Sequence, residues 1–253
     1  MTVKSGALAA LLVEARRGGR PIETVPPDLV PATASEAYEV QDAVAPALGA
    51  IAGWKVGAAS PTAEPNCAPL FAEIVASSPA RWPGARFRVR GVEAELAFRF
   101  GKTLPPREHP YGADEVWQAI DTLHVAIELV DSRFADFPAT DKLLQLADNQ
   151  NNGGFCYGAP IGPWRSVDFL RQPAGLRVDD REVASAVGGN AAGHPGRLLA
   201  WLADHLSRRG RGLAAGDIVT TGSHTGLVHV GPSAVVAARF AGLGEAVLSL
   251  ESP

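Results

Sequence analysis

An α+β fold is predicted for this 253-residue sequence, with helices first and strands dominating the rest of the chain. Apolar residues recur every three or four positions over the first 48 residues, which is typical of amphipathic helices. After Gly49 the pattern becomes strand-like over short stretches. The chain also holds 27 glycines and 20 prolines, spread without a period, so many turns must separate short elements. This order favours α+β over an alternating parallel fold.

Two helices are expected at the start of the chain. The first covers about residues 5–17 and ends at Gly18 and Gly19, because glycine adopts the left-handed conformation that closes helices. The second starts after a proline-rich connector, where Thr33 and Glu36 have capping-box spacing. Pro46 predicts that this second helix is short or bent near its end.

The remaining elements follow from shorter patterns bounded by glycine and proline. Strands are expected at 51–56, 71–75, 92–100, 123–130, 217–221, 234–240 and 246–250. Helices are expected at 113–122, 141–147 and 195–209. The last helix is the most strongly marked, because Pro195 near its start and Gly210 at its end flank a stripe of leucines.

Composition and charge argue against several classes of partner. Apolar residues make up 46% and charged residues 20%, as in ordinary globular proteins, and the formal net charge of −4 lacks the basic excess that nucleic acids or anionic membranes attract. The apolar runs are far shorter than the roughly 20 residues of a membrane-spanning helix. Charged residues follow the apolar start of the chain, which is therefore expected to be a helix and not a signal peptide. Two cysteines without CxxC spacing suit a cytoplasmic enzyme.

The strand at 92–100 carries the first candidate metal ligands. Side chains alternate across a strand, so Glu93 and Glu95 share one face. Their backbones lie roughly 6 to 7 Å apart, and their carboxylates can converge on one ion. Oxygen ligands favour a hard cation such as Mg²⁺ or Mn²⁺. A half-exposed strand with two solvated glutamates is the alternative.

A third carboxylate, Glu128, is embedded in the apolar run at 123–130, which predicts a buried strand. A buried carboxylate is costly without a cation or hydrogen-bond partners, and Glu128 is therefore a candidate third ligand. Asp131, just beyond the run, is a competing candidate whose alternative role is that of a turn or cap residue beside Ser132, so Glu128 is preferred.

Lys55 is the only charged residue in an apolar strand flanked by Gly53 and Gly57. Partial burial would suit this lysine to acid–base chemistry or to binding an anionic substrate. A solvent-exposed lysine at a strand edge is the alternative. The two glycines permit close approach of another backbone or a ligand.

Two polar clusters are further candidates. The stretch 148–154 is dense in Asn and Gly, and it is either part of a site or a long turn. The stretch 222–226 ends a strand with small hydroxyl residues and accessible amides, which could hold a carboxylate or simply form a hairpin turn.

Six motifs, taken in order, resemble the fumarylacetoacetate hydrolase superfamily, from about residue 35 to the C-terminus. Their spacing is similar to its 2-keto-4-pentenoate hydratase and 2-oxohex-3-enedioate decarboxylase branch. The motifs are GWKVG (53–57), EAELAF (93–98), IE (127–128), ADN (147–149), GHP (193–195) and GDIVTTGS (216–223). The resemblance implies a mixed β-roll core of the fumarylacetoacetate hydrolase type. It places a helical segment and first strand (1–70) on a catalytic core (71–253).

The resemblance also implies roles for individual residues. The metal ligands for Mg²⁺ or Mn²⁺ would be Glu93, Glu95 and Glu128. The catalytic residues would be Lys55 and Asp148. Substrate binding is expected from Asn149, Asn151, Ser223 and His224, of which His224 is a titratable group at a position where the family is expected to have none. Asn151 stands where the family commonly has a serine, and Asn66 where relatives often have an acidic residue, so the substrate is less firmly indicated than the metal.

The implied activity is a hydratase that adds water to a small 2-hydroxy-2,4-dienoate and yields a 4-hydroxy-2-oxo acid in the catabolism of aromatic compounds. One alternative is decarboxylation of 2-oxohex-3-enedioate (4-oxalocrotonate). Others are an acylpyruvate-type carbon–carbon hydrolase and a non-catalytic protein that binds oxo acids. Homo-oligomeric assembly is expected because relatives assemble.

Overall fold

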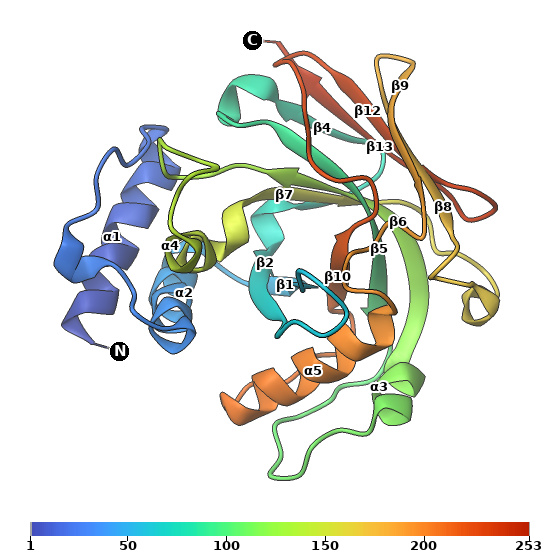
Figure 1. The fold of residues 1–253 in the computed structure, drawn as a ribbon, viewed down its shortest axis with the longest axis horizontal. Helices are drawn as coiled ribbons and strands as arrows, with labels where there is room; N and C mark the ends of the chain where they lie inside the picture. The colour runs from blue at the N-terminus through green and yellow to red at the C-terminus, as the bar shows by residue number, and fades with distance from the viewer. Residues whose placement is uncertain (1, 253) are drawn as a thin grey trace.

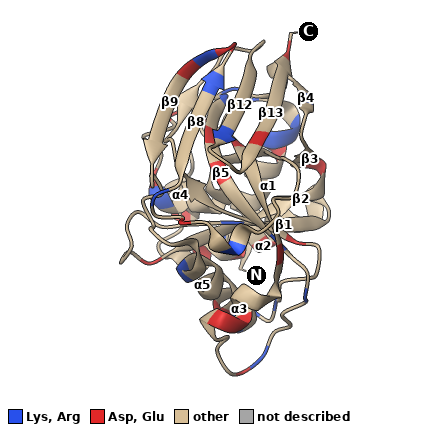
Figure 2. Cartoon of the chain, turned by 90° about the vertical axis from the view of Figure 1, so that its right-hand side faces the viewer, with Lys and Arg blue, Asp and Glu red and all other residues tan. Residues whose placement is uncertain are grey.

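Two β-sheets pack together, and five helices lie at their ends in this computed structural model, which describes residues 2–252 (Figure 1). The larger sheet has the order β2 (Asn66–Phe71), β1 (Ile51–Gly57), β10 (Ile218–Ser223), β5 (Gly91–Phe100), β6 (Ile120–Val130), β7 (Asn152–Tyr157) and β3 (Val75–Ser77), and β11 (Val228–His229) pairs with β5. The smaller sheet has the order β4 (Ala80–Pro83), β13 (Gly244–Glu251), β12 (Val235–Phe240), β8 (Pro173–Val178) and β9 (Arg181–Val187). Figure 2 shows these five strands side by side above α3 and α5.

The helices form two groups. They are α1 (Val3–Gly18), α2 (Ala34–Leu48), α3 (Ala113–Ala119), α4 (Lys142–Ala147) and α5 (Pro195–Arg208). α2 packs against both α1 and α4, whereas α3 packs against α5 at the other end of the larger sheet (Figure 1). The α+β class predicted from the sequence is confirmed.

The caps of the first two helices explain their boundaries. Gly19 ends α1 with φ +66°, the left-handed geometry that favours glycine. Thr33 accepts a hydrogen bond from the Glu36 amide at 3.2 Å and starts α2. The Glu36 carboxylate, however, accepts from the Ala32 amide at 3.0 Å and from Lys4 at 2.7 Å, so the predicted capping box is only half formed. Glu36 instead ties α2 to α1.

One expected strand is wrong, the helix expected at 113–122 ends early because β6 begins at Ile120, and several strands, β7 among them, were not expected. The predicted strand at 71–75 is wrong, because Ala72–Ile74 form a 3₁₀ turn and the strand β2 precedes it. Pro69 obscured β2, but the strand lies at the edge of the sheet, where a missing amide is tolerated. The β8–β9 hairpin was missed altogether. Asp179 and Asp180 turn it with φ of 48° and 65°, the positive values that a two-residue hairpin turn requires.

The pairing of four central strands brings distant segments together. β5 and β6 are antiparallel with Glu93 opposite Glu128. β10 pairs with the other edge of β5, with Ser223 opposite Glu95, and β1 lies parallel to β10. Four strands from three parts of the chain therefore supply one surface.

No helix within residues 2–252 has the length and apolarity needed to cross a membrane. β1 and β2 lie in the same sheet as the later strands. The division of the chain at residue 70 stays a prediction.

Candidate metal and substrate site

Three carboxylates converge where β5 meets β6. Glu93 and Glu95 share a face of β5, and Glu128 lies opposite Glu93 on β6. Each of the three offers an oxygen within 4.8 Å of the others. Glu95 and Glu128 are buried, and Glu93 is partly exposed. The local period of the strand and the register of the sheet together create this triad.

The triad is electrostatically unstable without compensation. Burial, then the charge of Glu128, raises the pKa of Glu93 to about 7. Burial, followed by the charges of Glu128 and Glu93, raises the pKa of Glu95 well above its ordinary value. Three carboxylates this close, two of them buried, require either protons or a cation. An all-oxygen set of this geometry fits a hard divalent ion.

Neighbouring side chains hold two of the carboxylates in place. The Thr220 hydroxyl donates to Glu95. Asn152 Nδ2 donates to Glu128 Oε1 at 2.9 Å, and Lys55 Nζ forms an ion pair with the same oxygen. Thr220 and Asn152 were missed as site residues, because nothing in a strand pattern marks a buried hydroxyl or amide as a partner of a distant glutamate.

Lys55 projects from β1 toward the triad. Its Nζ also donates to the Gln150 carbonyl at 3.1 Å. The preceding Gly53 is required here, because a Cβ at that position would lie 1.9 Å from the Ile218 carbonyl oxygen. The glycine lets β1 approach β10 closely, as the sequence predicted, and this approach brings Lys55 to the site.

A cavity of about 400 Å³ opens onto these groups, and we call it the acidic cavity. Its lining residues are Lys55, Val56, Gly57, Asn66, Glu93, Glu95, Glu128, Lys142, Gln145, Leu146, Gln150, Asn151, Gly222 and Ser223. Lys142, Gln145 and Leu146 from α4 were not predicted. Their spacing of three and four places them on one helix face, which is the signal that could have found them.

The segment from Asn149 to Asn151 has an uncommon backbone. All three residues have positive φ, at 50°, 52° and 57°, a region that asparagine tolerates better than most residues. This conformation directs the Gln150 carbonyl to Lys55 and places Asn151 in the cavity wall. Asn151 Nδ2 donates to Gln145 at 3.2 Å, while its buried Oδ1 has no partner among the described residues.

Ser223 also lines the acidic cavity. Its Oγ is buried and makes no hydrogen bond within the described part of the chain. The preceding Gly222 has φ +94°, so the chain turns sharply at this point. A buried hydroxyl without a partner is available to a ligand.

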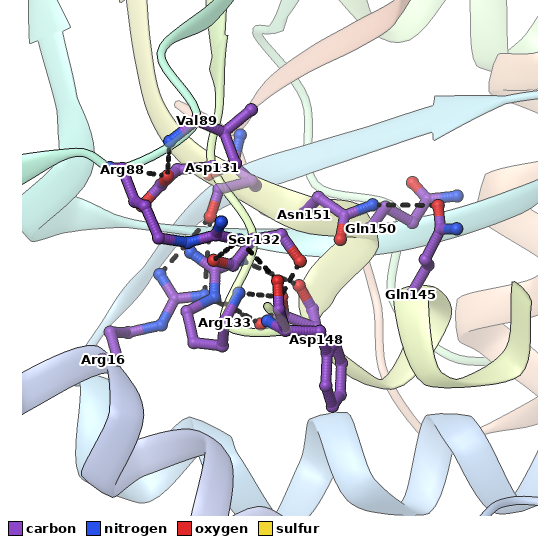
Figure 3. Close-up of polar contacts among 12 residues, drawn as sticks. Arg16, Arg88, Val89, Asp131, Ser132, Arg133, Gln145, Asp148, Gln150 and Asn151 are labelled. Atoms are coloured by element: carbon purple, nitrogen blue, oxygen red, sulfur yellow. Dashed lines mark hydrogen bonds and ion pairs between the residues drawn. The ribbon is translucent and has the colours of Figure 1, made fainter. Parts of the chain in front are cut away.

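Three predicted site residues lie elsewhere. Asp148 is buried and bonds Arg133, with its Oδ1 2.6 Å from Arg133 Nε (Figure 3). Asn149 is buried and does not line the cavity. His224 packs its ring against Phe240 at 5.0 Å between centroids, and burial lowers its pKa to about 4. A direct role for these three in catalysis or substrate binding is still only a prediction.

Asp131, the competing ligand candidate, is also directed away from the triad. Its Oδ1 accepts hydrogen bonds from the Arg88 and Val89 amides at 3.0 and 2.7 Å (Figure 3). The sequence could not separate Asp131 from Glu128 by spacing alone, but the register of β5 and β6 brings only Glu128 to the triad.

Comparisons with known proteins agree with this geometry. The family model described as fumarylacetoacetate (FAA) hydrolase C-terminal matches residues 59–250. A 2-keto-4-pentenoate hydratase of Burkholderia vietnamiensis is 29% identical over 94% of this chain and 94% of the relative. The TodF product hydratase of Pseudomonas putida is 32% identical over 96% of this chain and 95% of its own length.

A solved structure extends the comparison to the fold. The 4-oxalocrotonate decarboxylase from Pseudomonas putida G7, complexed with magnesium and adipate, superposes with a TM-score of 0.86 at 26% identity and covers 98% of both chains. The same enzyme is also known complexed with calcium and acetate. With the family match and the 32% identical relative, these likenesses show that the chain belongs to the fumarylacetoacetate hydrolase family.

Proposed function

We propose that this protein is a metal-dependent hydratase that converts a 2-hydroxy-2,4-dienoate into a 4-hydroxy-2-oxo acid in a cytoplasmic pathway of aromatic catabolism. The observation that carries the proposal is the acidic triad beside Lys55 in a cavity of about 400 Å³. Relatives along nearly the whole chain carry the name 2-keto-4-pentenoate hydratase, which supports this choice of reaction.

Glu93, Glu95 and Glu128 would hold a Mg²⁺ or Mn²⁺ ion. The raised pKa values of Glu93 and Glu95, and the close approach of all three carboxylates, suit a group that a cation compensates. When bound, the ion supplies positive charge that stabilises negative charge developing on a 2-oxo acid.

Lys55 is assigned the proton transfer. Its Nζ is held between two acceptors, the Glu128 carboxylate and the Gln150 carbonyl, and it faces the cavity. In ketonisation of the dienol, the C2 hydroxyl proton leaves and the terminal carbon gains a proton. Water then adds across the enone, with the hydroxyl on C4 and the proton on C3, so all atoms of the dienoate and one water appear in the product.

Ser223 and Asn151 are assigned substrate contacts. Both line the acidic cavity, and each carries a buried oxygen without a partner within residues 2–252. The Ser223 hydroxyl can donate to a substrate carboxylate. Asp148 would act indirectly, because its bond to Arg133 anchors the start of the left-handed segment that presents the Gln150 carbonyl to Lys55.

A second candidate function is decarboxylation of 2-oxohex-3-enedioate. The observation that favours it is Lys142, which lines the cavity and forms no ion pair in the described chain. This ammonium group could receive the second carboxylate that a dioate carries and a pentadienoate lacks. Adipate, the molecule bound in the similar decarboxylase, is itself a dicarboxylate.

The experiment supplies purified protein with Mg²⁺ or Mn²⁺ and follows the ultraviolet absorbance of 2-hydroxypenta-2,4-dienoate. A hydratase consumes the dienoate and forms 4-hydroxy-2-oxopentanoate. Release of CO₂ from 2-oxohex-3-enedioate without hydration activity would favour the decarboxylase. Turnover of neither substrate, beside an active control hydratase, would refute both assignments. Sedimentation of the same preparation tests the homo-oligomer that the family resemblance implies.

A further inference from the structure

A second and larger cavity lies beside α1, and we call it the arginine cavity. Its volume is about 730 Å³, and it shares no lining residue with the acidic cavity. Seven arginines from three separate parts of the chain line it: Arg16, Arg17, Arg20, Arg86, Arg88, Arg90 and Arg133. We propose that the arginine cavity binds an organic anion, with a carboxylate or phosphate group on the arginines and an apolar body against the remaining wall.

Carboxylates of the chain do not neutralise these arginines. Only Glu73 and Asp131 line the cavity with them, and Asp148 lies just behind. Glu73 pairs with Arg86 at 3.0 Å, but Asp131 is taken by two backbone amides. Seven guanidinium groups against three carboxylates leave four positive charges in excess, in a chain whose net charge is −4.

Several of the guanidinium groups are fixed by carbonyl oxygens instead. Arg17 donates to the Ala47 carbonyl at 3.1 Å, Arg90 to the Phe87 carbonyl at 2.6 Å, and Arg88 to the Phe134 carbonyl. These bonds orient the groups without cancelling their charge. Pre-oriented, uncompensated guanidinium groups are suited to binding an oxyanion.

Arg16 is partly buried and poorly compensated. Its side chain is 17% exposed, and its nearest carboxylate oxygen, Asp148 Oδ1, lies 3.6 Å away. Arg133 Nε holds the same oxygen at 2.6 Å, so two guanidinium groups share one carboxylate (Figure 3). Burial, then the charge of Arg133, lowers the pKa of Arg16 to about 9. A ligand anion beside Arg16 would supply the missing charge.

The rest of the wall indicates the body of the ligand. Leu48, Phe71, Ile74 and Phe87 line the same cavity. These side chains suit an aromatic or aliphatic body better than a fully hydrated inorganic ion. A volume of about 730 Å³ lies in the range of small-molecule sites.

The test is calorimetric titration of metal-free protein with phenyl phosphate, benzoate and inorganic phosphate. Omitting the metal prevents chelation of the anions at the acidic triad. We expect phenyl phosphate or benzoate to bind, and phenyl phosphate to bind about tenfold more tightly than inorganic phosphate because of the apolar wall. The absence of binding by both organic anions would overturn the proposal.

Variants locate the site. The double variant Arg16→Gln/Arg20→Gln should weaken binding about tenfold or more, because two charged hydrogen-bond donors are lost. The single variant Arg20→Gln keeps the test valid if the double variant does not fold. Arg20 is exposed and makes no hydrogen bond or ion pair to the described residues, so its replacement should not disturb the fold. It should weaken binding about threefold.

Arg239→Gln is the matched control. Arg239 is exposed on β12 in the smaller sheet, so its variant removes the same charge far from the cavity. Equal weakening by Arg239→Gln, or unchanged binding in the double variant, would refute the arginine cavity as the site. Dissociation of an oligomer in the double variant, with no anion binding by the parent protein, would instead make this face a subunit contact. Lys55→Met should bind the anion normally, which separates this proposal from the proposed enzyme activity.

Discussion

The acidic cavity and the arginine cavity hold an excess of charge of opposite sign. In the acidic cavity, three carboxylates outnumber two lysines, of which only Lys55 pairs with the triad, and the excess charge calls for a metal cation. In the arginine cavity, seven guanidinium groups face two lining carboxylates, and the excess calls for an anion. Neither local excess of charge can be read from the formal net charge of −4. Net charge describes the whole molecule, whereas ligand binding depends on the local excess of charge that folding creates.

Asp148 pairs with two arginines of the arginine cavity, and its loss should have the largest effect. Asp148→Asn would leave Arg133 and Arg16 without their shared carboxylate in a buried setting, so the free energy of unfolding should fall by about 3–5 kcal/mol. Urea denaturation measures the change. Asp180→Asn, at a fully exposed turn carboxylate, should leave the denaturation midpoint unchanged. Equal midpoints for Asp148→Asn and the parent protein would show that the buried pair contributes no stability.

Glu95→Gln tests the proposed metal site in the acidic cavity. Removing one carboxylate of the buried triad should reduce the hydration rate by about a thousandfold and lower the bound metal content, because the remaining donors hold the cation poorly. Absorbance kinetics and metal analysis measure the two effects. Glu245→Gln, at an exposed glutamate of β13, is the control. Full activity and full metal content in Glu95→Gln would refute the proposed site.

His224 follows Ser223 in the chain, and its buried imidazole makes the stability of the fold depend on pH. Its pKa falls from 6.5 to about 4 in the fold, so between these values the unfolded chain binds a proton that the folded chain does not. Stability present above pH 6.5 should therefore be lost as the pH falls toward 4, by roughly 3 kcal/mol from this residue. Denaturation of the parent protein and of His224→Leu across this range should give a shallower pH slope for the variant. Parallel slopes would contradict the assignment.

Lys55→Met separates catalysis from metal binding within the acidic cavity. The rate should fall about a hundredfold through loss of the proton-transfer group. Metal affinity should hold or rise, because Lys55 no longer competes for the Glu128 carboxylate. Steady-state kinetics at saturating metal and a metal titration distinguish the two. A parallel loss of metal and activity would mean that Lys55 supports the triad and does not transfer the proton.

Lys142→Ala should have the smallest effect, because this lysine is exposed at the cavity. We expect the KM for 2-oxohex-3-enedioate to rise by about tenfold at most, and the KM for the pentadienoate to stay unchanged. Arg165→Ala, on a remote 3₁₀ turn, is the control. Equal changes for both substrates would exclude recognition of a distal carboxylate by Lys142.

Much of the fold was predictable because it depends on local patterns. Period-two alternation predicted β5, and leucine spacing with flanking proline and glycine predicted α5. β2 was misplaced because Pro69 suggests a break, and only its position at the sheet edge explains why the strand tolerates it. The β8–β9 hairpin was missed because an Asp-Asp turn is a weaker signal than one that contains glycine.

Part of the candidate site could likewise be predicted from local patterns, and part of it could not. Glu93 and Glu95 could be paired from the sequence, since neighbours two apart on a strand share a face. Family resemblance indicated Asp148, and His224 was expected at the site as a departure from the family pattern, but their surroundings depend on contacts with Arg133 and Phe240 that no local pattern contains. Gln145 and Lys142 reach the cavity only through the packing of α4.

The sequence by itself determined the α+β class, the chemistry of the carboxylate donors and the family to which the motifs belong. The tertiary structure decided how closely Glu128, which the sequence already favoured over Asp131, approaches the other two carboxylates, that Asp148 faces away from them, and that arginines from three distant segments gather in one cavity. The physical reason is that dihedral preferences and hydrophobic period act over a few residues. Strand register and helix packing, which place charges beside one another, are set by the burial of the whole core.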